Sequence, residues 1–435
     1  MTGTPKVDLR WPASRADLAR LQSARKRRAV ELAMRAPFFR DRLAGIDLDR
    51  LDEPEVWAKI PVLTKDQLRA IPDGQFHEQF CVAPRRDVVE YWRSGGVTGR
   101  PLFYPRSAED MDWSILCFGR AFEVIGATPD DMAHVSFPLG IHPVAHLYAR
   151  AGEDLGIGTI WCGSGSNTAS LTQLELIRDL KPTIWCGMGS YGIHLANLAE
   201  ANGFDLAGSS VQKIIVAAEP LSPAKRQKLE RSWGATVSDQ FGMTEGALVS
   251  VQAPGEDGLR IWTDLFFCEV VDEATGAPLP DGEVGALVIT ALTNNNVTPF
   301  LRWYSGDLIS IQPGEGGDRP WSHFPVMRHA RRTVGFFKVR GVNINHNELE
   351  DLMFYNAGIT DFKAEVYNSG TGLDVLRLLI EPKRGLDVEE LRRTIGAGVM
   401  QTFEVTPEIT FLEACTIGKE FEGSIKAARF VDKRG

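Results

Sequence analysis

A glycine-rich loop that ends in a basic residue is the first segment whose residue types fit a chemical task. It runs over residues 94–101 with the sequence SGGVTGRP. Glycines let backbone amides approach phosphate oxygens closely, hydroxyls add donors, and Arg100 can offset negative charge. The loop has neither the GK[ST] ending of a P-loop nor the G-x-G-x-x-G spacing of a dinucleotide fold. By itself it therefore fits either a phosphate-binding loop or a plain surface turn.

Two later segments carry carboxylates beside glycines and hydroxyls. Residues 238–246 read SDQFGMTEG, and these residue types could hold an adenine ring and a phosphate-bound magnesium ion, which prefers hard oxygen ligands. Residues 302–308 read RWYSGDL, where the Asp307 carboxylate could accept two hydrogen bonds from ribose hydroxyls. A single loop aspartate is more often a turn former, so the ribose interpretation depends on the other segments.

Two basic segments follow, RRTVGFFKVRGVN at residues 331–343 and GSIKAARFVD at residues 423–432. A lysine near the end of a chain is usually a solvated charge, but the order of all five segments changes that interpretation. Together they resemble the adenylate-forming acyl-CoA ligase superfamily, and within it the phenylacetate-coenzyme A ligase branch. The resemblance runs almost end to end and also includes APFFR at 36–40, IPVLTK at 60–65 and AEPL at 218–221.

The resemblance implies an ATP-dependent ligase that forms an acyl-adenylate from a small carboxylic acid and then an acyl-CoA thioester, using ATP, Mg²⁺ and coenzyme A. Lys426 matches the lysine that bridges the acyl carboxylate and the α-phosphate. Thr244 matches the phosphate-binding hydroxyl, and Glu245 matches the magnesium-binding carboxylate. These three positions are the expected catalytic residues, with Glu245 also as the metal ligand.

The remaining nucleotide and CoA contacts are also implied by matching positions. The pyrophosphate loop corresponds to Ser94, Gly96, Thr98, Gly99 and Arg100. Positions expected at the adenine and its surroundings are Ala218, Glu219, Pro220, Asp239, Gln240, Phe241 and Gly242, the first three also lining the acyl site. Asp307 matches the ribose-binding aspartate, Arg332 an arginine near the domain hinge, and Arg340 with Gly341 the face presented to CoA.

The sequence departs from the family pattern at two places. The phosphate loop has Gly95 and Val97 where hydroxyl residues are common, and Arg100 where lysine is common, so backbone amides must do more. At the hinge, residues 334–335 are Val-Gly in place of the usual acidic pair. A glycine there can absorb large torsion changes, so domain rotation remains possible while its control is altered.

The acyl pocket is where the sequence says least about the substrate. The matching positions expected to line it are Phe137, Gly140, His142, Ser164 and Tyr191. His142 stands where an aromatic residue is expected; it either faces the acid or is satisfied by backbone groups and unrelated to substrate. If it faces the acid, a polar substituent is favoured, because an unpaired polar group in a closed pocket costs about 1–3 kcal/mol. We therefore expect a branched 2-hydroxy acid such as 2-hydroxyisobutyrate, with a phenylacetate-like aryl acid as the alternative.

The elements that must position these residues read as an α/β fold. Residues 13–43 favour helix, residues 213–218 a buried strand, and Ser222-Pro223 opens a helix that stops at Gly234. A helix over 172–180 is followed by a strand over 183–186, and period-two runs at 267–271 and 286–290 predict a β-rich part. The last hundred residues predict helices over 346–354 and 388–403 and strands over 362–367, 376–380 and 409–412.

We therefore expect a large multi-subdomain adenylation domain over residues 1–333 and a small mobile α+β domain over residues 334–435. A chain of 435 residues exceeds the usual limit of one core, which agrees with two domains. The net charge of -9 argues against nucleic-acid or membrane partners, which favour basic surfaces. The six scattered cysteines and the lack of a signal or membrane segment fit free thiols in a reducing cytoplasm.

Three alternatives concern the activity or the assembly. The acyl group could pass to a carrier-protein thiol in place of CoA, although the chain has no carrier domain of its own. A further alternative is a degenerate, non-catalytic binding protein. The chain keeps Glu245, Asp307 and Lys426, which argues against this alternative. The oligomeric state is open, with a homodimer as one candidate.

Overall fold

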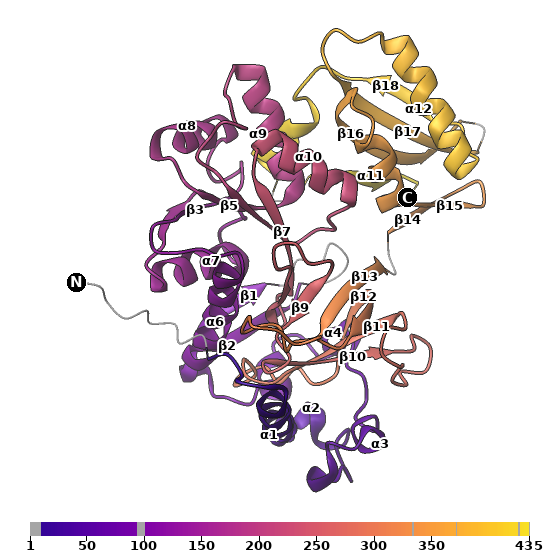
Figure 1. Cartoon of the computed structure of the whole chain (residues 1–435). Helices are drawn as coiled ribbons and strands as arrows, with labels where there is room; N and C mark the ends of the chain where they lie inside the picture. Colours follow the sequence, from indigo (N-terminus) through magenta and orange to yellow (C-terminus); the bar gives the residue numbers. More distant parts are fainter. Residues whose placement is uncertain (1–9, 94–100, 333–334, 371, 425–426, 435) are drawn as a thin grey trace. The chain divides into compact units, whose positions relative to one another are not determined.

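The computed structural model describes residues 10–93, 101–332, 335–370, 372–424 and 427–434 (Figure 1). The chain divides into two compact units. The first unit contains residues 1–130, 139–158 and 238–333, and the second contains residues 131–138, 159–237 and 334–435. The unit boundary between residues 333 and 334 coincides with the predicted domain boundary. Residues 334–435, however, belong to the same unit as residues 131–138 and 159–237. The division into a domain of residues 1–333 and one of residues 334–435 stays a prediction.

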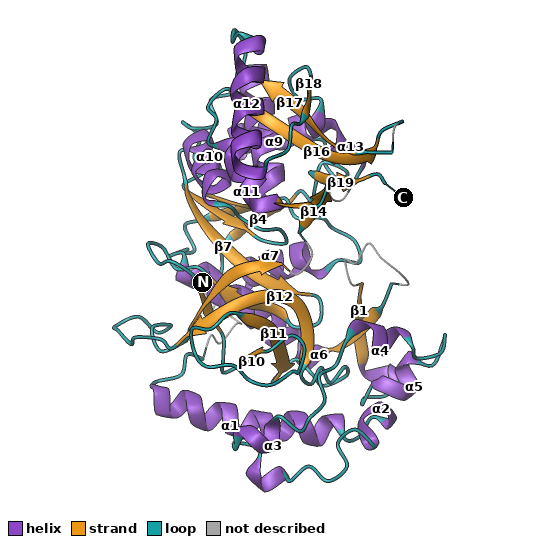
Figure 2. Ribbon diagram, turned by 90° about the vertical axis from the view of Figure 1, so that its right-hand side faces the viewer, coloured by secondary structure: helices purple, strands orange, loops and turns teal. Residues whose placement is uncertain are grey.

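Antiparallel strands form the sheet of the first unit, and two of them coincide with the runs predicted over 267–271 and 286–290. In spatial order they are β10 (Phe266–Val271), β11 (Gly285–Ala291), β12 (Trp303–Gln312), β13 (Val326–Arg332), β9 (Leu259–Ile261), β8 (Ala247–Val251) and β7 (Thr236–Met243). Figure 2 shows β10, β11 and β12 side by side. A separate ribbon pairs β1 (Val88–Arg93) with β2 (Phe103–Ser107), so the strands on either side of residues 94–100 are hydrogen-bonded to each other.

Helices of the first unit precede and flank this sheet. They are α1 (Arg15–Ala33), α2 (Pro37–Arg40), α3 (Pro54–Trp57), α4 (Lys65–Arg69), α5 (Phe76–Phe80), α6 (Ala108–Val124) and α7 (Pro143–Asp154), with 3-10 turns η1 (Leu48–Arg50) and η2 (Arg85–Asp87). The prediction of one helix over 13–43 was wrong, because α1 ends at Ala33 and a new short helix begins at Pro37. Proline lacks the amide donor that a continuing helix would need and its ring clashes with the preceding turn.

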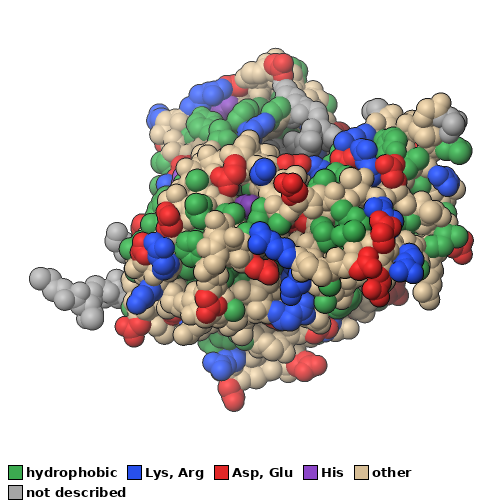
Figure 3. Space-filling model, turned by 90° about the horizontal axis from the view of Figure 1, so that it is seen from above, with side chains coloured by type: hydrophobic (Ala, Val, Ile, Leu, Met, Phe, Trp, Pro, Cys, Tyr) green, Lys and Arg blue, Asp and Glu red, His purple; other side chains and the backbone are tan. Residues whose placement is uncertain are grey.

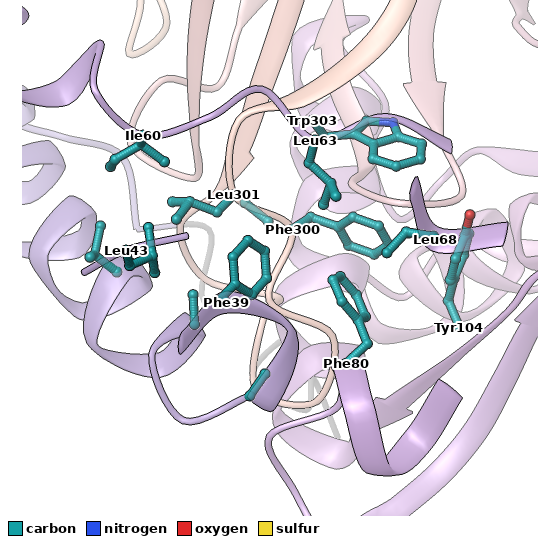
Figure 4. Close-up of a cluster of buried hydrophobic side chains, with 14 of the residues drawn as sticks. Phe39, Leu43, Ile60, Leu63, Leu68, Phe80, Tyr104, Phe300, Leu301 and Trp303 are labelled. Carbon is teal, nitrogen blue, oxygen red and sulfur yellow. The ribbon is translucent and has the colours of Figure 1, made fainter. Parts of the chain in front are cut away.

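An aromatic core joins these short helices to the sheet of the first unit (Figure 4). The Phe300 ring lies 5.5 Å from Phe80 of α5, 5.1 Å from Tyr104 of β2 and 5.3 Å from Trp303 of β12, measured between ring centroids. All four side chains are buried. Edge-to-face pairs at such distances stabilise by about 0.5–1.5 kcal/mol each beyond their buried area. This core therefore fixes β2 and the start of β12 relative to each other.

The second unit begins with alternating strands and helices, as an α/β layer requires. Parallel strands β3 (Met132–Val135), β5 (Ile184–Gly187) and β6 (Lys213–Val216) pair in that order, with β4 (Gly158–Trp161) beside β3. The helices are α8 (Ser170–Leu180), α9 (Gly189–Asn202) and α10 (Pro223–Trp233). The predicted limits of α10 are confirmed, since Ser222 caps its first turn and Gly234 ends it with a φ of +62°.

Residues 335–434 form a small α+β part of the second unit. Its four-stranded sheet has the order β18 (Glu408–Phe411), β17 (Asp374–Pro382), β16 (Ile359–Asn368), β19 (Phe430–Asp432). The other elements are the hairpin of β14 (Phe336–Val339) and β15 (Val342–Asn345), helices α11 (His346–Phe354), α12 (Val388–Phe403) and α13 (Glu420–Gly423), and η3 (Ile417–Lys419). The predicted helices over 346–354 and 388–403 are confirmed with these same limits.

Basic and acidic side chains are interspersed on the face shown in Figure 3. Within the part of the chain that the structure describes, no helix is both long and apolar enough to cross a membrane.

The buried histidine on β3 predicts a specific pH dependence of stability. His134 is fully buried, its Nε2 lies 3.2 Å from Gln173 Oε1, and burial lowers its pKa from 6.5 to about 4. The unfolded chain then binds more protons between those values, so the free energy of unfolding falls as pH drops through that window. His134 contributes about 3 kcal/mol to this fall at pH 4.

We expect His134→Gln to make the free energy of unfolding less dependent on pH, because glutamine has no charged form. Urea denaturation at pH 7 and about pH 4.5 measures the difference. His146→Gln, at a half-buried position on α7, is the matched control and should keep the parental dependence. The same loss of stability on acidification in His134→Gln and in the parental chain would contradict this assignment.

Candidate active site

A tight turn between β7 and β8 presents the predicted phosphate and metal residues. The turn consists of residues 244–246, and Gly246 N donates to Met243 O over 3.1 Å. Before it, a side chain at Gly242 would place its Cβ 2.6 Å from Ala247 O, so the close approach of the two strands requires glycine. Strand β7 extends through Met243, so residues 238–243 are part of a strand and only residues 244–246 form a turn.

A fully buried arginine on β2 holds this turn in place. Arg106 Nη2 donates to Thr244 O over 2.9 Å and to Glu245 O over 2.8 Å. Its Nη1 donates to Asn294 O over 2.8 Å and to Thr298 Oγ1 over 3.1 Å. The planar guanidinium thus satisfies four acceptors from two segments far apart in the sequence, which a lysine could not do in the same geometry. Sequence reasoning missed Arg106, because a lone arginine in a strand carries no local signal.

The Glu245 carboxylate is suited to a magnesium ion. It is 7% exposed, and Tyr104 OH donates to its Oε1 over 3.0 Å. Among the described residues, no hydrogen bond reaches Oε2, which leaves a hard oxygen for a ligand. No group of three or more potential metal-ligating side chains occurs within the described ranges. A magnesium ion held here by Glu245 would take its remaining ligands from phosphate oxygens and water, and would supply positive charge opposite the phosphates.

The residues before the turn are largely buried in β7. Gln240 is 3% exposed and accepts a hydrogen bond from Tyr148 OH at its Oε1. Phe241 packs edge-to-face against His329 of β13 at a centroid distance of 5.0 Å. Asp239 O accepts from the backbone of the neighbouring strand segment over 2.8 Å. His329 is a further neighbour of the predicted adenine residues that the sequence gave no reason to select.

The predicted ribose aspartate lies in β12 and not in a loop. Asp307 is 6% exposed, its amide donates to Ser305 Oγ over 3.1 Å, and it stands opposite Arg332 in the pairing of β12 with β13. Gly306 has a φ of +82°, a conformation that favours glycine. The backbone register therefore brings the predicted ribose residue and the predicted hinge arginine to one level of the sheet.

A buried ion pair fixes the start of β12. Arg302 and Glu269 lie 3.0 Å apart between Nη2 and Oε1, with both side chains at most 6% exposed, and Trp57 Nε1 donates to Glu269 Oε2 over 2.9 Å. The IPVLTK segment is bonded to the same part of β12, since Leu63 N donates to Arg302 O over 2.8 Å and Tyr304 N donates to Leu63 O over 2.9 Å. This segment has no reactive side chain in the proposed chemistry, and its contribution is to hold the start of β12.

The Ala-Glu-Pro corner of the second unit turns sharply after β6. Ala218 has a φ of +70°, and the side chains of Ala218 and Pro220 are exposed. Glu219 instead points to α9, accepting from Ser190 N over 2.6 Å and from Ser190 Oγ over 2.7 Å, and pairs with Lys225 at 3.0 Å. Burial opposes the Glu219 charge, but Lys225 and Ser190 outweigh it and lower the pKa. Its carboxylate therefore supports the corner internally.

The predicted pocket residues fall on both units. Phe137, Ser164 and Tyr191 are buried in the second unit, whereas Gly140 and His142 belong to the first. Gly140 is exposed with a φ of +100°, and His142 is half-buried immediately before α7. A shared acyl pocket of these five residues stays a prediction.

Two of the buried hydroxyls already have partners within the second unit. Tyr191 OH lies 3.0 Å from Ser170 Oγ, and Ser164 Oγ lies 2.9 Å from Ser166 Oγ. The Tyr191 ring also packs against Phe421 of α13 at 5.3 Å. Tyr191 therefore has an evident packing role, which the sequence did not indicate.

The remaining predicted residues are in two groups. Arg340 and Gly341 form the two-residue turn between β14 and β15 with φ values of +50° and +86°, as a type I′ hairpin turn requires, and Arg340 Nε donates to Asp374 O over 2.9 Å. Outside the described residues lie Ser94, Gly96, Thr98, Gly99, Arg100 and Lys426.

Comparison with known proteins identifies what this arrangement resembles. The family described as AMP-binding enzyme matches residues 131–294. A phenylacetate-coenzyme A ligase of Pseudomonas putida is 30% identical over 92% of this chain and 90% of its own length. A 2-hydroxyisobutyryl-CoA ligase in the postadenylation state, in complex with 2-HIB-AMP, has a TM-score of 0.83 at 21% identity and covers 100% of this chain and 94% of that one. In its thioesterification state, with 2-HIB-AMP and CoA, the TM-score is 0.68 at 22% identity, with 98% and 91% covered.

The buried arginine predicts a joint loss of stability and nucleotide binding. We expect Arg106→Lys to lower the free energy of unfolding by about 3 kcal/mol, because lysine leaves several of the four buried acceptors unpaired. The same change should weaken ATP binding, since the Thr244–Glu245 turn loses its support. Urea denaturation and calorimetric titration with ATP measure both effects.

Arg328→Lys is the control, because Arg328 forms an exposed pair with Asp257 at 3.1 Å and should change stability by less than about 1 kcal/mol. Unchanged ATP affinity in folded Arg106→Lys would show that the turn does not depend on this arginine.

Proposed function

We propose that the acid used by this chain is a small branched 2-hydroxy acid. The premise is that the chain belongs to the phenylacetate-coenzyme A ligase family of AMP-forming acyl-CoA ligases. The observation that carries the proposal is His142, which is half-buried at the start of α7 while Phe137, Ser164 and Tyr191 are fully buried. Its imidazole can hydrogen-bond a substrate hydroxyl, which an apolar lining would leave unpaired. The fold shared with a 2-hydroxyisobutyryl-CoA ligase is compatible with this choice.

A phenylacetate-like aryl acid is the second candidate. It is favoured by the 30% identity to the Pseudomonas putida phenylacetate-coenzyme A ligase over most of both chains. A pocket that selects an aryl acid needs apolar surface and no polar partner. The two candidates therefore differ in what His142 does.

The reaction follows from the weakness of a carboxylate as an acylating agent. A carboxylate oxygen of the acid attacks the α-phosphorus of ATP, the bond to the pyrophosphate oxygen breaks, and pyrophosphate leaves. The CoA sulfur, after losing its proton, then attacks the acyl carbon of the adenylate, and AMP leaves with the bonding electron pair. We assign Arg100, Thr244 and Lys426 to offsetting phosphate charge in the first step and Asp307 to the ribose.

The acceptor and the domain motion complete the proposal. CoA is the acceptor we assign, with Arg340 and Gly341 facing it, and a carrier-protein thiol is the alternative. We further propose that residues 334–435 act as a mobile domain, with Val334-Gly335 as the hinge, because the similar 2-hydroxyisobutyryl-CoA ligase has been solved in a postadenylation and in a thioesterification state. The two half-reactions would then use different arrangements of this domain.

The acid is tested by comparing catalytic efficiencies for 2-hydroxyisobutyrate, isobutyrate, phenylacetate and benzoate, with CoA present. We expect the hydroxy acid to be preferred over isobutyrate by roughly tenfold or more, because an unpaired polar group costs about 1–3 kcal/mol. His142→Phe should abolish that preference while leaving the efficiency for isobutyrate nearly unchanged. His146→Phe, four residues further along α7, serves as the control.

Preference for phenylacetate in the parental chain would refute the 2-hydroxy acid. A hydroxy-acid preference that His142→Phe leaves untouched would remove His142 from the recognition site. Thioester formation on a carrier-protein thiol but not on CoA would identify the alternative acceptor.

Lys426 tests the two arrangements. We expect Lys426→Ala to abolish acyl-adenylate formation, measured as pyrophosphate release, because the bridging charge is lost. Thioester formation from presynthesised adenylate should stay largely intact. Equal loss in both half-reactions would contradict the alternation, and loss in neither would point to Lys419 or Lys433 as the bridging residue.

A further inference from the structure

A cluster of charged side chains joins α10 to residues 335–434 within the second unit. Its members are Glu219, Lys225 and Lys228 on one side and Glu350, Asp361 and Arg429 on the other. Lys225 Nζ lies 3.0 Å from Glu219 Oε1 and 3.2 Å from Glu350 Oε1. The Lys225 and Glu350 side chains are 4% and 5% exposed, so water screens this contact little.

The two sides are electrostatically complementary. The side that contains α10 carries one carboxylate and two ammonium groups, whereas the other carries two carboxylates and one guanidinium. In addition, Asp351 Oδ1 accepts from Ala224 N over 2.9 Å, which places a carboxylate at the positive end of α10. Lys228 Nζ donates to Ile359 O over 2.8 Å and to Thr360 O over 2.6 Å. Opposite charge thus favours docking of one side on the other.

Lys225 is shared between the sides, and this makes the contact reversible. If the sides part, Lys225 keeps Glu219, while Glu350 keeps Arg429 at 3.5 Å. Breaking a buried pair is costly mainly when a charge is left without a partner, and Lys225 and Glu350 each keep one. Lys228, whose hydrogen bonds to Ile359 O and Thr360 O cross the contact, would exchange them for water. Burial opposes the charge on Lys225, but Glu219 and Glu350 outweigh it and raise its pKa, so it stays charged at neutral pH.

We propose that Lys225 and Glu350 form the docking contact that holds residues 335–434 against α10 during adenylate formation and that opens for thioester formation. The inference rests on the domain alternation of the proposed function and adds the residues that control it. Lys225 also binds Glu219 of the Ala-Glu-Pro corner, and Arg429 follows Lys426 by three residues. Through Glu350 the contact therefore links Arg429 to that corner.

The test separates the half-reactions in matched carboxamide variants of the full-length chain, using the best acid of the four-acid panel. We expect Glu350→Gln to slow pyrophosphate release roughly tenfold. Thioester formation from presynthesised adenylate should change little, because the contact is open in that step. Glu365→Gln is the control, since Glu365 is also buried but pairs with Arg377 and Lys433, both at 2.6 Å and all within residues 335–434. It should leave the ratio of the two rates unchanged.

A double-mutant cycle identifies the pair itself. Lys225→Gln and Glu350→Gln should show coupling in pyrophosphate release and none in thioester formation. Asp351→Ala, which removes a half-buried contact to the start of α10, gives a second variant that is expected to fold and to show the same selective loss.

The outcomes separate this inference from the proposed function. The docking contact would be overturned if Glu350→Gln impaired both half-reactions equally. It would also be overturned if Glu365→Gln changed the ratio of the two rates as much as Glu350→Gln does, or if the double-mutant cycle showed no coupling. If Lys426→Ala is selective for pyrophosphate release and Glu350→Gln is not, the docking contact alone is refuted. If Lys426→Ala impairs both steps equally, the alternation itself fails.

Discussion

The arrangement of the first unit depends on the hydrogen bonds of one buried guanidinium. Arg106 leaves water entirely, and that cost is offset only when its donors meet acceptors in a fixed geometry. The acceptors are the carbonyls that shape the Thr244–Glu245 turn and groups from residues 294–298. The guanidinium carbon also lies 4.6 Å from the centre of the Trp92 ring on β1. One side chain thus ties the ribbon flanking residues 94–100 to the turn that presents Glu245.

The same logic recurs at β12, where a buried charge positions a backbone segment. Glu269 and Arg302 neutralise each other, and the remaining guanidinium donors reach Ala58 O and Ile60 O, over 3.1 and 2.6 Å. The strand that carries Asp307 is thereby anchored at its start. Buried ion pairs of this kind add little net stability but penalise alternative arrangements, since any shift leaves a charge without a partner. They suit a site whose groups must stay in place through a reaction.

The charged cluster of the second unit has a different design. Arg106 satisfies four acceptors in two segments at once, whereas Lys225 has a partner on each side of its contact. The domain alternation that we propose would need a fixed nucleotide site and a contact that can open. Under that proposal the two properties belong to different parts of the fold.

The sequence by itself determined the elements with local signals and the family. Ser222-Pro223 and Gly234 set the limits of α10, because caps depend on residues within one turn. Thr64 with Gln67 forms a capping box at the start of α4 in the same local way. The five ordered segments were enough to identify an AMP-forming acyl-CoA ligase, since each is a short contiguous motif. The helix expected over 13–43 was wrong in its extent, because α1 ends at Ala33 and Pro37 begins a separate four-residue helix.

Only the tertiary structure decided which side chains are engaged in contacts within the protein. The Glu219 carboxylate accepts hydrogen bonds from Ser190 and pairs with Lys225. The Tyr191 ring packs against Phe421, a residue 230 positions later in the chain. Arg106 acquires its role from carbonyls 138 and more residues away. Asp307 lies in a strand because β13 pairs with β12 there, which the Ser305-Gly306 sequence before it did not indicate. The reason is common to all four: burial and pairing are set by residues distant in sequence, and a local pattern carries no record of them.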